Sequence, residues 1–165
     1  MDEIAYLSNY LNKYVTACHA ARNAKKKAKE LAKTDKKAAF EELYCVLEGL
    51  DALGAISLDS MENKAIYDQN EYAICMTFEN YLEMMVDVGQ YGEQSKQFEG
   101  AEKYLKYANK LAPKNTDVLL SIGNVYWEQG KKKPAKYIYK GYISLMKKQG
   151  KKRQIPKFAK RHARG

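Results

Sequence analysis

The feature that most constrains the fold of this chain is a recurrence of similar residues 34 positions apart, between residues 82 and 149. The matched pairs are Met85 and Leu119, Val88 and Ile122, Gly89 and Gly123, Ala101 and Ala135, and Leu105 and Tyr139. A fixed period of this length is typical of proteins that stack one small helical unit on the next. Around each pair, apolar residues recur three or four positions apart, which predicts helices rather than strands.

The residues at these recurring positions resemble the tetratricopeptide repeat, a helix–turn–helix unit. The second copy carries Leu119, Ile122, Gly123, Tyr126, Gly130, Ala135 and Tyr139, and the first adds Ala101, Leu105, Ala108 and Pro113. The resemblance covers about two repeats, residues 82–115 and 116–149. It implies an all-α fold of antiparallel helical hairpins stacked as a short right-handed solenoid. Small or aromatic residues would pack the helices at Gly89, Ala101, Ala108, Gly123, Tyr126, Ala135 and Tyr139.

Upstream of the repeats, the apolar spacing predicts a long helix over residues 3–33 and a second helix that ends near Gly54. Thr34 and Asp35 offer capping side chains for the second helix. Residues 1–58 should therefore form an N-terminal hairpin, with the helical repeats occupying 59–149. About three units are needed to bury a continuous core, so residues 1–80 should complete the stack. This build also resembles, in architecture alone, the small repeat chaperones of type III secretion.

The family resemblance implies a concave groove lined by the first helix of each unit. Carried over by position, the groove comprises Glu83, Val86, Asp87, Gln90, Asp117, Leu120, Ser121, Asn124, Trp127 and Glu128. Trp127 is the single Trp, and large aromatic residues are frequent binding hot spots, although lateral core packing explains it equally well. The acidic lining favours a basic peptide or helix as ligand. Val86 and Gln90 replace the Lys and Asn of the family's carboxylate clamp.

Charge is strongly segregated along the chain. Residues 41–102 contain two basic and fourteen acidic groups, whereas residues 129–165 contain fourteen Lys and Arg and no acid. We interpret residues 150–165 as a basic tail, with order ending at Gly150 and a short helix allowed after Pro156. The cations at this end are Lys147, Lys148, Lys151, Lys152, Arg153, Lys157, Lys160, Arg161 and Arg164. They could bind nucleic acid, form a nuclear address, solubilise the chain or fold over its acidic segment.

No catalytic motif is recognisable in the sequence. It lacks a phosphate-binding loop, a nucleophile elbow and a CxxC pair, and its His and Cys residues have no metal-ligand spacing. We expect no cofactor, no metal and no enzyme activity. Three widely spaced cysteines favour reduced, buried thiols. Without a signal sequence or a long apolar run, the chain is expected to be cytoplasmic, with no membrane partner.

The sequence therefore predicts a protein–protein interaction scaffold, either an adaptor or a chaperone, that binds a peptide or helix of another protein. The alternative is a nucleic-acid-associated or ribosome-associated factor that uses the basic tail. Self-association stays open, and the sequence does not name the partner.

Overall fold

The computed structural model describes residues 3–52 and 78–165, and in these ranges the chain is entirely helical. It divides into two compact units, residues 1–84 and 85–165, and the boundary falls within helix α5 (Phe78–Gln94). The boundary predicted at residues 58 and 59 lies outside the described residues. The predicted all-α architecture of antiparallel hairpins is confirmed, and within the second unit successive helices pack on one another in chain order.

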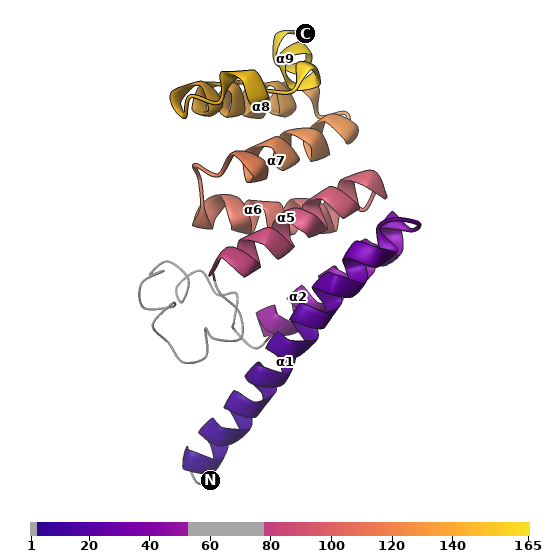
Figure 1. The fold of residues 1–165 in the computed structure, drawn as a ribbon, viewed down its shortest axis with the longest axis vertical. Helices are drawn as coiled ribbons and strands as arrows, with labels where there is room; N and C mark the ends of the chain where they lie inside the picture. The colour runs from indigo at the N-terminus through magenta and orange to yellow at the C-terminus, as the bar shows by residue number, and fades with distance from the viewer. Residues whose placement is uncertain (1–2, 53–77) are drawn as a thin grey trace. The chain divides into compact units, whose positions relative to one another are not determined.

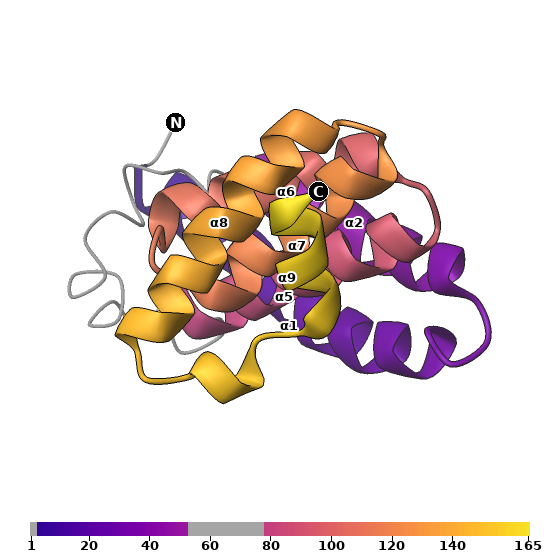
Figure 2. The same ribbon diagram turned by 90° about the horizontal axis from the view of Figure 1, so that it is seen from above.

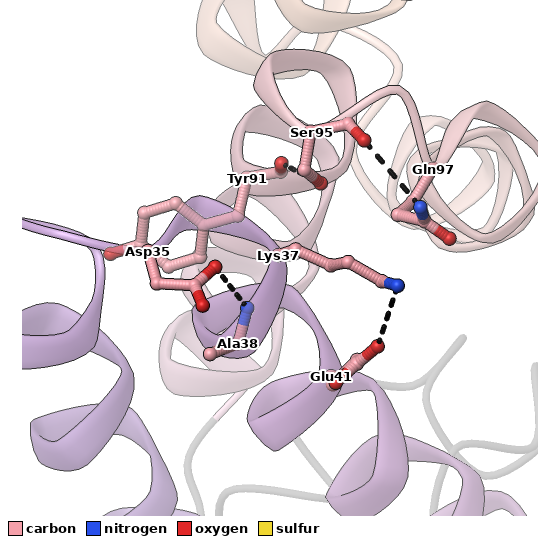
Figure 3. Close-up of polar contacts among 7 residues, drawn as sticks. All are labelled: Asp35, Lys37, Ala38, Glu41, Tyr91, Ser95 and Gln97. Carbon is pink, nitrogen blue, oxygen red and sulfur yellow. Dashed lines mark hydrogen bonds and ion pairs between the residues drawn. The ribbon is translucent and has the colours of Figure 1, made fainter.

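The first unit contains a helical hairpin of α1 (Glu3–Leu31) and α2 (Lys36–Ala52) (Figure 1). Alanines of α1 pack in its interior, where Ala21, Ala24 and Ala28 are almost completely buried. Small side chains let two helix backbones come close together. As predicted, Asp35 caps α2: its Oδ1 accepts a hydrogen bond of 2.9 Å from the Ala38 N–H (Figure 3).

Surface ion pairs account for several charges of the first unit. Lys37 and Glu41 of α2 pair across one helical turn at 3.7 Å (Figure 3). Lys27 of α1 pairs with Glu42 of α2 at 2.9 Å. The charge of Lys27 is thus partly compensated within the chain.

The second unit contains the end of α5 and four further α-helices, and its first four helices follow one another as antiparallel neighbours (Figure 1). They are α6 (Phe98–Leu111), α7 (Thr116–Glu128), α8 (Lys132–Lys148) and α9 (Lys157–Arg164). The Asn115 side chain caps α7 by accepting from the N–H groups of Asp117 and Val118, at 3.0 and 3.2 Å. Pro134 lies in the first turn of α8, where its missing N–H costs little.

The turns that end α5 and α7 repeat the same backbone geometry 34 residues apart. Lys96 and Gly130 both have a positive φ, 61° and 76°. In each turn the following N–H, of Gln97 or Lys131, returns to a carbonyl five residues earlier, at 2.7 and 2.9 Å. This is the Schellman arrangement, in which a left-handed residue closes the helix end. Side chains reinforce the first turn, where Ser95 donates to the Tyr91 carbonyl and Gln97 donates to the Ser95 carbonyl (Figure 3).

The helix crossings repeat as well. A Cβ built on Gly89 of α5 would lie 2.6 Å from the Leu105 side chain of α6. A Cβ built on Gly123 of α7 would lie 2.8 Å from Cε1 of Tyr139 in α8. Both glycines are buried, and both partners stand sixteen positions further along the chain. The recurrence in sequence therefore corresponds to one hairpin geometry used twice.

The chain does not become a loose tail after Gly150, so the prediction that order ends there is wrong. A short 3-10 helix, η2 (Lys152–Gln154), turns the chain back, and α9 packs on α8, as seen from above in Figure 2. Ile155, Ala159 and Ala163 are buried in one apolar cluster with Tyr139, Tyr142 and Met146 of α8. The short helix anticipated after Pro156 is confirmed, and its buried side holds the C-terminal residues in place.

Candidate interaction site

The first repeat places its predicted groove residues on α5. Glu83 is exposed but forms an ion pair of 2.6 Å with Lys25 of α1, so its charge is partly compensated within the chain. Gln90 is exposed, and Val86 and Asp87 are half-buried. This part of the predicted surface thus offers few accessible groups.

The second repeat uses several predicted groove residues for internal packing. Ser121 is only 4% exposed. The Asn124 Oδ1 accepts a hydrogen bond of 2.8 Å from the Tyr139 hydroxyl. Leu120 is half-buried against the α8–α9 cluster, whereas Asp117 and Glu128 are exposed. Of the α7 positions, the two acids are the ones most available to a partner.

Trp127 is engaged by the C-terminal helix. The imidazole of His162 in α9 stacks on its indole, with ring centroids 3.5 Å apart and planes 8° from parallel. Lys132 Nζ also lies over the indole, 3.8 Å from a ring centroid, and donates to the Trp127 carbonyl at 2.9 Å. Such contacts are favourable, because the face of an indole attracts cations. Trp127 therefore contributes mainly to packing in this structure, which is the second of the two roles weighed from the sequence.

An acidic hollow lies where the end of α7 meets the start of α6. It has a volume of about 490 Å³. Its walls are formed by Phe98, Glu99, Glu102, Glu128, Gln129 and Lys131. Three of these six residues are glutamates, so the hollow suits a positively charged group better than an anion.

Glu102 is the most strongly held carboxylate of the hollow. Burial would raise its pKa, but hydrogen bonds from Lys106, Gln129 and Lys131 lower the pKa to about 2. The donor atoms lie 2.7, 3.1 and 3.1 Å from its oxygens. Glu102 is therefore already compensated, and its role is to fix the α7–α8 turn to α6.

Glu93, near the end of α5, is different. Burial raises its pKa, and the neighbouring charge of Glu128 raises it further. No Lys or Arg in residues 78–165 forms an ion pair with Glu93 or Glu128. The same two carboxylates act on Tyr139, whose pKa is raised mainly by burial and then by their charges. The first helices of the two repeats thus bring two carboxylates within electrostatic reach of each other, and neither has an ion-pair partner in residues 78–165.

Sequence reasoning missed Glu93 and His162. Glu93 lies three residues beyond the last groove position predicted on α5, and only the helix extension to Gln94 brings it to Glu128. His162 was missed because it stands in a segment rich in Lys and Arg. The four-residue spacing of Ile155, Ala159 and Ala163 could have revealed that this segment forms a helix with one buried face.

The described residues contain no group of His, Cys, Asp and Glu that could hold a metal ion. Cys18 is buried and is not in a disulfide, as expected, and the neighbouring His19 is exposed. Cys45 is exposed, so the prediction of a buried thiol is wrong there, because Cys45 lies on the outer face of α2. Cys75 lies outside the described residues. None of the described helices is long and apolar enough to cross a membrane.

The fold and site define a class of architecture, an all-helical chain of antiparallel hairpins whose second unit stacks its helices in chain order and carries an acidic hollow. Comparison with protein families, with curated proteins and with solved structures finds no match to this chain.

Proposed function

We propose that this protein is a non-enzymatic interaction scaffold of the tetratricopeptide type, an adaptor or chaperone that binds a basic segment of another protein. The observation that carries the proposal is the acidic hollow, whose walls include Glu99, Glu102 and Glu128, together with Glu93, which lies close enough to Glu128 for that charge to raise its pKa. The charge of Glu128 makes ionisation of Glu93 less favourable, and a cation beside the two carboxylates would offset that effect. A Lys or Arg side chain of a partner peptide would supply that cation.

The rest of the array supports the role. Its helices are held by glycine crossings, capped ends and a C-terminal helix, so the hollow is presented on a pre-formed frame. A rigid frame lowers the entropic cost of binding. Glu102, Gln129 and Lys131 line the hollow, and the hydrogen bonds from Gln129 and Lys131 to Glu102 help to fix its shape.

A labelled peptide tests the proposal directly. Fluorescence anisotropy would compare a lysine-containing peptide with the same peptide carrying Gln in place of Lys. We expect the lysine peptide to bind more tightly, and the double variant Glu93→Gln/Glu128→Gln to lose about tenfold in affinity, equivalent to about 1.4 kcal/mol. Glu48→Gln, on an exposed position of α2, is the matched control and should leave binding unchanged.

Proton linkage gives a second readout. A bound cation should lower the raised pKa of Glu93, so binding should release protons and weaken as the solution is acidified. Equal binding of both peptides by the double variant and the native chain would refute the proposal. A pull-down from cells with and without nuclease would show whether captured partners bind through protein contacts, in which case they survive nuclease treatment, or through nucleic acid, in which case they are lost.

A further inference from the structure

The outer face of α8 presents an exposed aromatic ring among lysines. Lys133, Tyr137, Lys140, Gly141 and Ser144 recur three or four residues apart and are all exposed. Tyr137 is 78% exposed, a large value for an aromatic side chain. Most Tyr residues with known burial in this unit are buried or half-buried, which makes Tyr137 an exception. The Tyr137 ring is therefore largely exposed to water, and packing within the fold does not explain its presence there.

The charge around this ring is not neutralised by the chain. Among the described cations of residues 131–165, Lys131 is the one that forms an ion pair with a carboxylate, that of Glu102. Lys132 and Lys136 donate instead to the carbonyls of Trp127 and Gly165. Like charges one turn apart, such as Lys133 and Lys136 or Lys136 and Lys140, destabilise a helix by about 0.2–0.5 kcal/mol per pair. An external polyanion would remove this repulsion.

Three kinds of polyanionic partner fit a basic surface, and the burial pattern separates them. A helix that enters a lipid surface needs a free apolar face. Here the apolar faces of α8 and α9 are already buried against each other: Tyr142 and Met146 of α8 pack in one cluster with Ile155 and Ala159. An acidic protein segment would use the lysines but needs no exposed ring. Single-stranded nucleic acid uses both, because its phosphates bind cations and its bases stack on aromatic side chains.

We propose that the outer face of α8 binds single-stranded nucleic acid, with backbone phosphates on Lys133 and Lys140 and a base stacked on Tyr137. Recognition by phosphate contact and stacking carries no sequence code, so the surface should accept RNA and DNA strands of any sequence. Arg153, Lys157 and Arg161 of η2 and α9 are also exposed and add positive charge to this end of the chain. This surface is separate from the acidic hollow, and the inference does not rest on the proposed function.

The test is fluorescence anisotropy of the full chain with labelled twelve-nucleotide oligo-uridine and oligo-thymidine over a range of salt concentrations. Binding should weaken steeply with salt, with a slope of about −0.7 per neutralised phosphate. Lys133→Gln/Lys140→Gln should make that slope shallower by about 1.4. Lys26→Gln/Lys29→Gln removes the same charge from exposed positions of α1 and should leave the slope unchanged.

Tyr137→Ala distinguishes stacking from simple charge attraction. It should weaken binding by roughly 5- to 150-fold, the range measured for loss of one stacked base, while leaving the salt slope intact. Tyr137→Phe should retain binding. Because Tyr137 is exposed, circular dichroism should show both variants folded.

Other outcomes would overturn the proposal. Binding that poly-glutamate competes away as well as oligonucleotide does, with no effect of Tyr137→Ala, would assign the surface to an acidic protein. Binding to vesicles that contain phosphatidylserine, with no binding to either oligonucleotide, would assign it to a membrane. Failure of both oligonucleotides to bind at low salt would leave the lysines as a solvated face.

Discussion

Replacing Gly123 by Ala tests the central packing feature of the second unit. The added Cβ would lie 2.8, 3.0 and 3.2 Å from three ring carbons of Tyr139, where ordinary carbon contacts are about 3.5–4.0 Å. The Tyr139 ring cannot easily move away. Its hydroxyl donates to Asn124, and its ring packs edge-on against Trp127 and Phe158, with centroids 6.3 and 6.4 Å apart.

Two effects of opposite sign decide the magnitude. Overpacking a well-filled core costs about 1–3 kcal/mol. Replacing a helical Gly by Ala gains about 0.8–1 kcal/mol from helix propensity. Gly141, on the exposed side of α8, has no atom within 4 Å of its built Cβ, so Gly141→Ala should show the gain alone. The difference in unfolding free energy between the two variants should therefore equal the packing cost, about 1–3 kcal/mol.

Urea unfolding provides the assay. Emission of Trp127 reports on the second unit because it is the single Trp of the chain, and circular dichroism reports on all helices. Agreement of the two transitions would justify a two-state treatment. If Gly123→Ala proves as stable as Gly141→Ala, the helices do not need a glycine at this crossing, and the reasoning from close approach is refuted.

Three further predictions follow from single contacts. Lys96→Gly should stabilise the chain by about 1 kcal/mol in urea unfolding, because Lys96 alone of the non-glycine described residues has a positive φ; destabilisation would contradict this. The pKa of Glu102 is lowered from 4.5 to about 2, so its contribution to stability is complete above pH 4.5 and is lost as the pH falls toward 2. Acid unfolding should show this loss in the native chain and little of it in Glu102→Gln. Burial, then Arg161 and Lys132, lower the pKa of His162 against the opposite effect of Glu128, so docking of α9 should weaken as the pH falls below 6.5. Trp127 emission should change over that range in the native chain, and an equal change in His162→Gln would exclude His162 as the cause.

The repeated hairpin was predictable because its determinants are local. Asn115 caps the helix that follows it, Pro113 lies just beyond the end of α6, and Gly89 and Gly123 mark the crossings from their spacing alone. These residues act through the geometry of their own helices, which the sequence displays directly. The predicted groove was less predictable, because the accessibility of Asn124 and Trp127 to a partner depends on residues distant in sequence, Tyr139 and His162, that contact them.

The order of the C-terminal segment could not be inferred from its composition. An eight-residue helix is not stable by itself, so α9 depends on tertiary contacts. Those contacts are a ring stack with Trp127 and the burial of two alanines, signals that are weak beside so many cations. The turn at Lys96 was hard to predict for a different reason. A residue with left-handed backbone is usually Gly, as at the equivalent Gly130, but the first turn has Lys at this position.

The equivalence of the two turns and the two crossings has a consequence for lengthening the chain. If residues 116–149 were duplicated in tandem, each helix of the added hairpin would pack against neighbours of the same kind that α7 and α8 have now. Insertions of a whole period should therefore add a layer while leaving α9 to close the new end. An insertion of another length within α5 or α7, ahead of the glycine, would turn a larger side chain toward Leu105 or Tyr139, and the two helices would be forced apart at that point.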